Sequence, residues 1–240
     1  MNLRISRVVA LAFLTTSLIA TTAYAALSTA EQKRLNDAAA VVMALRGAEN
    51  GISEDLWQKA ACVIVIPDMK KAAFIFGGEY GKGVMSCRTA NGWGSPVFME
   101  LEKGSWGFQA GAQEIDLVLL VMNRDSATKM LNSKVSLGAD ASVAAGPVGR
   151  AASASTNRNL SAQILSYSRS HGVFAGINLS GGALKVDADS NTDAYGKGAA
   201  LEALLNGTGP TLQGANAFLN ALGPSPAATT GTTKPAPTAK

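Results

Sequence analysis

Residues 62–66, Cys62-Val63-Ile64-Val65-Ile66, begin the stretch that decides the fold, which ends at residue 122. The rest of this stretch contains further short segments rich in Val, Ile and Phe, broken by glycine, at residues 72–76, 84–88, 97–101, 106–110 and 115–122. Apolar, β-branched segments bounded by turn residues are typical of β-strands. Because parallel strands need crossover connections of about a dozen residues or more, these short gaps predict a mostly antiparallel sheet.

Strand-like sequence returns after a helical turn that we predict around residues 126–131. It covers residues 135–148 and then 164–186. In the later part, apolar residues at 173, 175, 177 and 179 alternate with their neighbours, which is the period of two that a half-buried strand shows. We therefore expect both segments to extend the sheet.

Helices are predicted at both ends of this sheet. Ser28 and Glu31 form a capping-box pattern, and Leu35, Val42 and Leu45 then recur at helical spacing as far as residue 48. Ser53 is a cap for a second, short helix that ends at residue 59. Two more helices are expected at residues 193–205 and 210–222, the latter with Pro210 in its first turn.

Helices that flank a long run of antiparallel strands define the α+β class. The chain is rich in glycine and has only 6% aromatic residues. Glycine inside strands marks bulges and close backbone approaches. We therefore predict an α+β domain with a mostly antiparallel, strongly twisted or barrel-like sheet and with helices at the N- and C-terminal ends.

The two ends of the chain differ from this body. Residues 1–25 have a basic start, a short apolar core and the small-x-small pattern Ala23-Tyr24-Ala25, which predicts a signal peptide of bacterial form. A retained membrane anchor is the alternative, although the apolar run is shorter than the ~20 residues that span a bilayer. Residues 224–240 are rich in Pro, Ala and Thr and are expected to be disordered, either as a tether or as an inert tail. The domain is then 26–223, exported and periplasmic or envelope-associated, with secretion as an alternative.

The charge of the body argues against nucleic acid as a partner. The whole chain has 21 Lys and Arg residues against 17 Asp and Glu. Four of the basic residues, at positions 4, 7, 234 and 240, lie outside the body, which then carries equal numbers of both signs. Anion or membrane binding must therefore depend on a local patch of basic residues.

The two cysteines, Cys62 and Cys87, predict one disulfide bond in an oxidising compartment. It would close a loop of about 26 residues and stabilise the fold by roughly 3 to 4 kcal/mol in the chain-entropy model. Two free buried thiols are the alternative. Zinc is not expected, because two cysteines and the distant His171 do not make a ligand set.

Several separated motifs resemble the SYLF domain family, in the right order and over residues 30–205. They are Gly77-Gly78-Glu79-Tyr80-Gly81-Lys82-Gly83, Ser86-Cys87-Arg88, Trp93 and Pro96, Gly107-Phe108-Gln109-Ala110-Gly111, Gly146-Pro147-Val148-Gly149-Arg150, Tyr167-Ser168-Arg169-Ser170-His171-Gly172-Val173-Phe174-Ala175-Gly176, and Tyr195-Gly196. The resemblance implies a lipid-binding module with no catalytic residues. Eukaryotic members bind phosphoinositides, some bind actin filaments, and bacterial members are exported. Eukaryotic members contact lipid through an N-terminal amphipathic helix, which corresponds here to residues 28–48.

Seven basic residues are candidates for a cationic face that binds lipid phosphate, with scattered solvated side chains as the alternative. They are Lys33, Arg34, Lys59, Lys70, Lys71, Lys82 and Arg88. Lys82 lies in Tyr80-Gly81-Lys82-Gly83, which invites a phosphate-loop interpretation. The nucleotide P-loop pattern fails, because Phe76 replaces its first glycine and Gly83 its Ser or Thr. A glycine-rich turn or bulge that shapes the sheet is the alternative.

Asp187, Asp189, Asn191 and Asp193 alternate as oxygen ligands do in a calcium loop. The pattern departs from the EF-hand, which has a glycine where this chain has a threonine and a glutamate where it has a glycine. A polar loop in which Asn191 or Thr192 caps the next helix is the alternative.

Catalysis has little support in the sequence. His171 is the only histidine, so a serine triad or acid-base mechanism near neutral pH would depend on it. No Gly-x-Ser-x-Gly elbow is present, and the neighbours of His171 indicate a turn between strands. We therefore expect an exported, non-catalytic lipid-binding module without a cofactor. A structural or protein-interaction module of the cell envelope is the alternative, and a hydrolase using His171 is the weakest one. The expected partner is a lipid or membrane surface, or else an envelope protein, and the oligomeric state is open.

Overall fold

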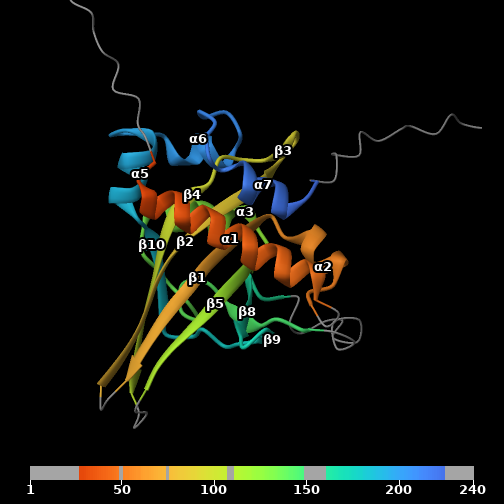
Figure 1. Ribbon diagram of the computed structural model, residues 1–240, viewed down its shortest axis with the longest axis vertical. Helices are drawn as coiled ribbons and strands as arrows, with labels where there is room; N and C mark the ends of the chain where they lie inside the picture. The colour runs from red at the N-terminus through yellow and green to blue at the C-terminus, as the bar shows by residue number, and fades with distance from the viewer. Residues whose placement is uncertain (1–26, 49–50, 74–75, 107–110, 149–160, 225–240) are drawn as a thin grey trace, which may run out of the picture.

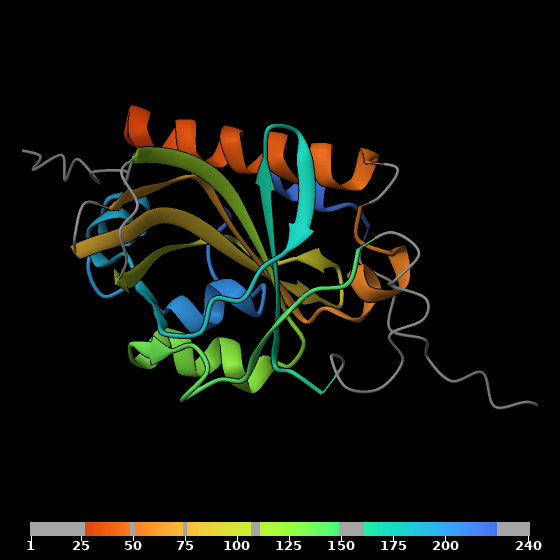
Figure 2. The ribbon, with the colours of Figure 1, turned by 90° about the horizontal axis from the view of Figure 1, so that it is seen from below.

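The computed structural model describes residues 27–48, 51–73, 76–106, 111–148 and 161–224. It is an α+β fold in which a strongly curled, half-barrel sheet carries helices from both ends of the chain (Figure 1). Figure 2 shows α1 lying across one side of the sheet and α3 lying on the other. The predicted fold class is confirmed.

The first two helices follow the predicted caps. Helix α1 spans Thr29–Gly47, and its capping box is complete because the Ser28 hydroxyl accepts from the Glu31 amide while Glu31 accepts from the Ser28 amide at 2.7 Å. These bonds satisfy amide groups that a helix end otherwise leaves unpaired. Helix α2 spans Glu54–Lys59 and is capped by Ser53.

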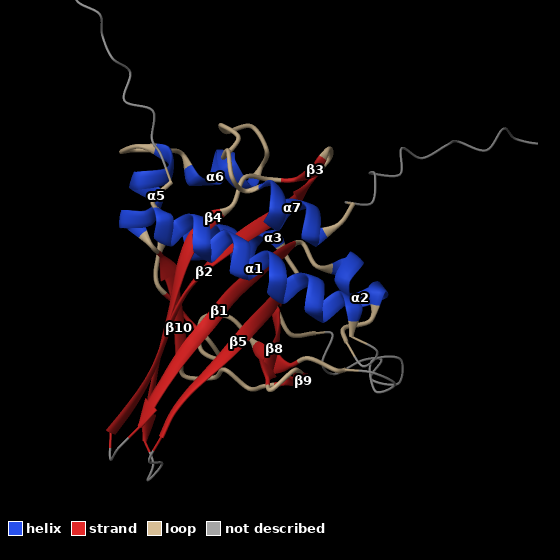
Figure 3. Cartoon of the chain, viewed as in Figure 1, coloured by secondary structure: helices blue, strands red, loops and turns tan. Residues whose placement is uncertain are grey.

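The sheet has the strand order β6-β10-β4-β2-β1-β5-β8-β7, with β3 paired to β2 and β9 to β8. Every pairing between these strands is antiparallel except that of β7 with β8. The bounds are β1 Cys62–Ala73, β2 Phe76–Thr89, β3 Gly92–Trp93, β4 Val97–Trp106, β5 Gly111–Val121, β6 Val135–Ser136, β7 Val143–Ala145, β8 Ile164–Ser170, β9 Val173–Gly176 and β10 Gly182–Val186. Figure 3 shows β1, β2, β4 and β5 continuing well beyond α1.

The long strands differ from the short ones that the sequence predicts. The segments expected at 72–76 and 84–88 belong to one hairpin of β1 and β2, because the ladder continues through the glycines of β2. The strand expected at 106–110 is the end of β4 at Trp106, and residues 107–110 lie outside the described part of the chain. The expected 135–148 strand region contains only the two short strands β6 and β7.

The later helices have other bounds than predicted. Helix α3 spans Arg124–Asn132 and includes the expected helical turn. The helix expected at 193–205 is split into α5 (Ala188–Tyr195) and α6 (Leu201–Leu205), because Gly196 and Gly198 between them have φ of 84° and 76°. That left-handed conformation ends a right-handed helix and suits glycine. Helix α7 is Asn216–Leu222, so Pro210 is not in its first turn.

Two apolar layers hold the sheet between the helices. On one side, Leu35, Val42 and Leu45 of α1 pack with Val65 and Val84 of the strands. The other layer contains side chains of α3 and α6 packed against the opposite face of the same strands. Burial of each large aliphatic side chain stabilises the fold by roughly 1.5 to 3 kcal/mol. The apolar stripe of α1 is therefore used inside the domain, and its one large exposed apolar side chain among the described residues is Met43.

The C-terminal end of α7 is held by side chains from elsewhere in the fold. Arg46 and the Trp57 indole each donate to the Leu222 carbonyl at 3.1 Å. The Trp93 indole donates to the Gly223 carbonyl at 2.8 Å, and Arg88 donates to the Pro224 carbonyl at 3.5 Å. Carbonyl groups that a helix end cannot pair internally are thus satisfied by α1, α2, β2 and β3.

Candidate functional site

A pocket of about 370 Å³ lies between the N-terminal half of α1 and the strands β1 and β2. We call it the α1–β2 pocket. It is lined by Ala30, Lys33, Arg34, Asp37, Pro67, Asp68, Lys70, Tyr80, Gly81 and Lys82. Four of the seven predicted cationic residues are therefore brought together from three separate elements.

A bulge in β1 shapes the floor of this pocket. The register of β1 against β2 shifts between Val65 and Lys70, and Asp68 within this segment has φ of 49°. Its amide donates to the Asp116 carboxylate of β5 at 3.1 Å. A bulge adds residues to one strand and re-aims the neighbouring side chains, which here brings Asp68 and Lys70 to the pocket.

Glycines of β2 allow this close approach. A Cβ atom at Gly83 would lie 2.2 Å from the Val65 carbonyl oxygen, and one at Gly81 would lie 2.5 Å from an Ile66 methyl carbon. Both contacts are closer than atoms can pack, so a side chain at either position would force the strands apart. The motif at residues 80–83 lies inside a strand rather than in a turn, and the bulge is in the strand beside it.

The inner wall of the pocket is a buried ion cluster. The Asp187 side chain is only 1% exposed and accepts from Arg34 at 3.0 Å and from Lys82 at 2.9 Å. It also accepts from the Ser190 hydroxyl at 2.7 Å. Burial acts to raise the pKa of Asp187, but hydrogen bonds from Lys82, Ser190 and Arg34 outweigh it, so the pKa is lowered. Arg34, which also lies 5.3 Å from the Phe98 ring centre, and Lys82 therefore join α1 and β2 to α5.

The outer rim of the pocket carries exposed charges. The Lys33 side chain is 68% exposed, pairs with Asp37, and lies 3.8 Å from Asp68. Its pKa is raised, chiefly by the hydrogen bond to Asp37. Lys70 is 77% exposed and lies 4.0 Å from the Glu114 carboxylate. Exposed pairs of this kind contribute little to stability, because water and salt screen them and long side chains lose entropy on pairing. Lys33 and Lys70 can therefore exchange partners.

Two of the other three predicted cations, Lys59 and Arg88, do not line the pocket. Lys59 pairs with Asp55 at 2.7 Å on α2. Arg88 donates to the backbone carbonyls of Ala60 and Trp57 at 3.0 and 2.8 Å and lies 4.3 Å from the Trp93 ring centre, so it fastens the end of α2 to the sheet. Lys71 is in β1, but its side chain lies outside the described atoms.

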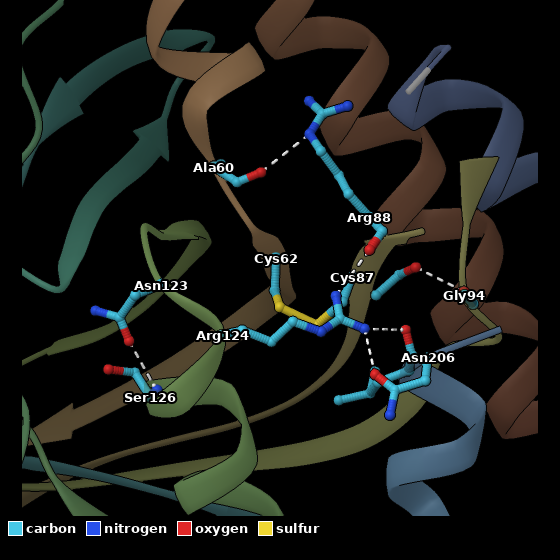
Figure 4. The surroundings of a disulfide bond; sticks show 11 residues. Ala60, Cys62, Cys87, Arg88, Gly94, Asn123, Arg124, Ser126 and Asn206 are labelled. Carbon is cyan, nitrogen blue, oxygen red and sulfur yellow. Dashed lines mark hydrogen bonds between the residues drawn. A yellow bond between two sulfur atoms is a disulfide. The ribbon is translucent and has the colours of Figure 1, made fainter. Parts of the chain in front are cut away.

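The predicted disulfide joins Cys62 of β1 to Cys87 of β2, which are direct partners in the ladder (Figure 4). Both cysteines are fully buried. Figure 4 also shows Arg124 beside the bridge, where it donates to the Arg88 carbonyl at 2.7 Å and to the Leu205 carbonyl at 2.8 Å. The bridge thus belongs to a structural cluster at the end of the sheet that α2 and α6 cover.

The residues considered for calcium lie on a helix. Asp187 is the N-cap of α5, and Asp189, Asn191 and Asp193 are within that helix. Asp187 therefore caps this helix, in place of the predicted Asn191 or Thr192. The Asn191 side chain instead accepts from the amide of Phe98 in β4 and donates to the carbonyl of the same residue. Within the described ranges, no three or more His, Cys, Asp or Glu side chains are grouped to hold a metal ion.

His171 lies in the turn between β8 and β9, as its neighbours in the sequence predict. It is exposed, has φ of 51°, and its Nδ1 atom shares a hydrogen bond of 3.0 Å with the Ser170 hydroxyl. His171 is not among the residues that line the α1–β2 pocket, which come from α1, β1 and β2. None of the helices in the described part of the chain is long and apolar enough to cross a bilayer.

Three pocket residues were missed by the search for cations. Asp37 could have been found, since it follows Lys33 by four residues on a helix and such residues are neighbours. Asp68 had only a weak signal, its position after a proline in a strand-like segment. Tyr80 was noted only as part of the glycine-rich motif, and its contribution to the pocket follows from the register of β2.

A curled sheet with a helix laid over a pocket of paired charges fits the class of non-catalytic binding modules. The chain belongs to the Ysc84, or SYLF, family: the family model described as "Las17-binding protein actin regulator" matches residues 102–224, which confirms the predicted resemblance.

Similar curated proteins carry the same family name. "LAS seventeen-binding protein 3" of Saccharomyces cerevisiae is 31% identical over 166 residues, which cover 67% of this chain and 36% of that protein. "Protein YSC84" of the same yeast is 30% identical over 154 residues, 62% of this chain and 33% of that protein. "SH3 domain-containing YSC84-like protein 1" of Bos taurus is 30% identical over 135 residues, 55% of this chain and 39% of that protein. The chain thus spans about a third of the length of these relatives, of which the first is named for binding and none is named as an enzyme.

Proposed function

We propose that this protein is a non-catalytic module that binds the phosphate of membrane phospholipid headgroups at the α1–β2 pocket. The observation that carries the proposal is the gathering of Lys33, Arg34, Lys70 and Lys82 around one pocket. Phosphate oxygens accept charge-assisted hydrogen bonds from lysine, which are stronger than those between neutral groups.

The four cations have different tasks in this proposal. Arg34 and Lys82 are held by the buried Asp187 carboxylate, so they fix the pocket wall and the position of α1. Lys33 and Lys70 have exposed side chains, whose pairs with Asp37, Asp68 and Glu114 contribute little to stability because solvent screens them. They are therefore the side chains that contact a headgroup phosphate.

Helix α1 supports contact with the headgroup rather than deep insertion of the helix into a membrane. Its larger apolar residues Leu35, Val42 and Leu45 are buried against the sheet and α7. Exposing them would remove several kcal/mol of core burial, at roughly 1.5 to 3 kcal/mol for each side chain. The polar edge of α1 that borders the pocket remains available.

Vesicle flotation of residues 26–240 tests the proposal. The wild type and the double variant Lys33→Ala/Lys70→Ala are mixed at low salt with vesicles of phosphatidylethanolamine and phosphatidylglycerol in equal parts. Because each lost lysine removes a charge-assisted contact, we expect the variant to bind about tenfold or more weakly. The matched control Lys59→Ala/Lys129→Ala removes two exposed lysines of α2 and α3 and should float like the wild type. Equal losses in both double variants, or no flotation of the wild type, would contradict the proposal.

We also propose that the module acts outside the cytoplasm, after removal of residues 1–25. The support is the signal-peptide pattern together with a disulfide between buried cysteines, which is typical of oxidising compartments. Expression with residues 1–25 in a Gram-negative host should give an envelope-fraction protein whose N-terminal sequencing starts at residue 26. An uncleaved protein in the cytoplasmic fraction would show this part to be wrong.

Protein interaction is the second candidate function. It is favoured by the names of the family and of the yeast relative, which refer to Las17 binding and to actin regulation. Co-sedimentation with actin filaments tests it directly. If this domain binds actin filaments, the protein should pellet with them. Protein that stays in the supernatant at all filament concentrations would count against it.

A further inference from the structure

The charges that face out of the α1–β2 pocket are balanced. Arg34 pairs from behind with the buried Asp187, and Lys82 pairs with Asp187 and with Glu100 at 3.5 Å, so two carboxylates match these two cations. The remaining charged side chains of the lining are two lysines, Lys33 and Lys70, and two carboxylates, Asp37 and Asp68. A purely anionic ligand would therefore meet as many repulsive groups as attractive ones.

From this balance we infer that the pocket is selective for a zwitterionic headgroup that carries a primary amine next to its phosphate, as in phosphatidylethanolamine. The inference rests on the proposed function and names the ligand class of that same site. Lys33 and Lys70 bind the phosphate, whereas Asp37 and Asp68 bind the ammonium group. Tyr80, which is 44% exposed and lines the pocket, offers an aromatic side chain on which a cation can rest.

The lysine and aspartate side chains can exchange partners without leaving a charge unpaired. In the free pocket Lys33 pairs with Asp37 and lies 3.8 Å from Asp68. When a phosphate takes Lys33, the two carboxylates lose their cation, and the ammonium group of the same headgroup replaces it. An anionic headgroup without an amine would leave both carboxylates without a partner, which disfavours it.

The donor chemistry separates ethanolamine from choline. A primary ammonium, like that of a lysine side chain, has three N–H donors. Two carboxylates can therefore accept hydrogen bonds from it at the same time. A quaternary choline has no such donor, so it can make only the weaker contact with the Tyr80 ring. The pocket volume of about 370 Å³ lies at the small end of the range for ligand sites, which suits a headgroup rather than a whole lipid.

Flotation with vesicles that differ from each other in one headgroup tests this selectivity. The probes are phosphatidylcholine vesicles alone and the same vesicles with equal parts of either phosphatidylethanolamine or phosphatidylglycerol. We expect the wild type to bind the ethanolamine vesicles about tenfold more tightly than the glycerol vesicles. The double variant Asp37→Asn/Asp68→Asn should reverse this order, because its lysines are no longer opposed. Asparagine is tolerated at the positive φ of residue 68, and circular dichroism checks that the variant is folded.

A matched control replaces two exposed carboxylates away from the pocket. Asp55→Asn/Asp125→Asn, on α2 and α3, should keep the wild-type preference. The inference is overturned if the wild type prefers phosphatidylglycerol, or if the two aspartate double variants show the same preference. Binding to phosphatidylglycerol that still depends on Lys33 and Lys70 would overturn the selectivity and support the proposed function. Absence of binding to every vesicle would contradict the proposed membrane binding, and the soluble headgroup then tests the inference alone.

A soluble headgroup identifies the source of the ligand. Glycerophosphoethanolamine is titrated into the wild type and followed by chemical shifts of the pocket residues. Competition with ethanolamine vesicles supports a membrane lipid as the ligand. Binding of the soluble compound without any flotation would support the headgroup chemistry and contradict a membrane as its source.

Discussion

Replacing Asp187 with asparagine should weaken the whole domain while leaving its helix cap in place. The carboxylate is 1% exposed and accepts from Arg34 and Lys82, which come from α1 and β2. Asparagine has the same shape and retains one oxygen for the Ser190 amide that the carboxylate now binds at 3.2 Å. What it lacks is the charge that two cations share.

The loss of unfolding free energy depends on how exposed to solvent each of the two cations is. Removing one partner of a buried ion pair typically costs about 3 to 5 kcal/mol, because the other charge stays buried without compensation. Arg34 is only 11% exposed and falls in this class. Lys82 is 35% exposed and keeps Glu100 at 3.5 Å, so its share is small. We therefore expect a loss of about 2 to 3 kcal/mol, at or just below the lower end of that range, because asparagine still accepts a hydrogen bond.

Urea unfolding measures this loss, and Asp189→Asn on the exposed side of the same helix is the matched control. With an m-value of about 2 kcal/mol per molar, the Asp187→Asn midpoint should fall by about 1 to 1.5 M, whereas the control should change little. The pKa of Asp187 is lowered in the folded state, so its stabilisation is present above the unfolded pKa and is lost as pH falls through the folded value. The difference between wild type and variant should shrink accordingly in acid. A variant within about 0.5 kcal/mol of the wild type at pH 7 would refute the ion cluster as a structural element.

Three further perturbations have definite signs. Gly83→Ala puts a Cβ atom 2.2 Å from a β1 carbonyl oxygen and should destabilise by about 1 to 3 kcal/mol in thermal unfolding, whereas Gly78→Ala, with no atom within 4 Å, should not. Cys62→Ala/Cys87→Ala opens a bridge with a sequence separation of 25 and should lower the unfolding free energy by about 3 to 4 kcal/mol, and an unchanged value would show that the loop entropy model fails here. Hydrogen bonds from two lysines lower the pKa of Glu102 from 4.5 to about 2, so its contribution should be complete above pH 4.5 and vanish towards pH 2. Because the Glu102 side chain is 37% exposed, Glu102→Gln should make the unfolding free energy fall only slightly less steeply as the pH is lowered. A steeper fall in the variant would contradict the pairing of Glu102 with the lysines.

Local signals in the sequence predicted local structure well. The capping box at Ser28 and Glu31 consists of neighbouring residues that bond to each other, so α1 begins within a residue of its expected start. Glycine was the main source of error. In β2, Gly81 and Gly83 indicated breaks, yet they are needed where a bulged strand passes close beside them. At Gly196 and Gly198, glycine did end a helix, because there the backbone has positive φ.

The pocket could be predicted only in part. The basic residues were recognisable by type. Lys33 and Lys82 line the same pocket because of the β1 bulge and the sheet register, which no short pattern in the chain reveals. The alternation of Asp187 with neighbouring polar residues suggested only a candidate calcium ligand, beside a polar loop as the alternative. Its partners, Arg34 and Lys82, are more than 100 residues away in the chain, so its place in an ion cluster follows from tertiary structure alone.

The anchored end of α7 has a mechanical consequence. The carbonyls of residues 222–224 are bound by side chains of α1, α2, β2 and β3, and the disulfide joins β2 to β1 near the same end of the sheet. A pull on the chain beyond Pro224 would therefore spread over several parallel hydrogen bonds and into a covalently closed hairpin, instead of peeling one short helix away. If residues 225–240 serve as a tether, the domain meets tension at a reinforced attachment point, while the α1–β2 pocket lies at the opposite end of α1 and outside the path of the load.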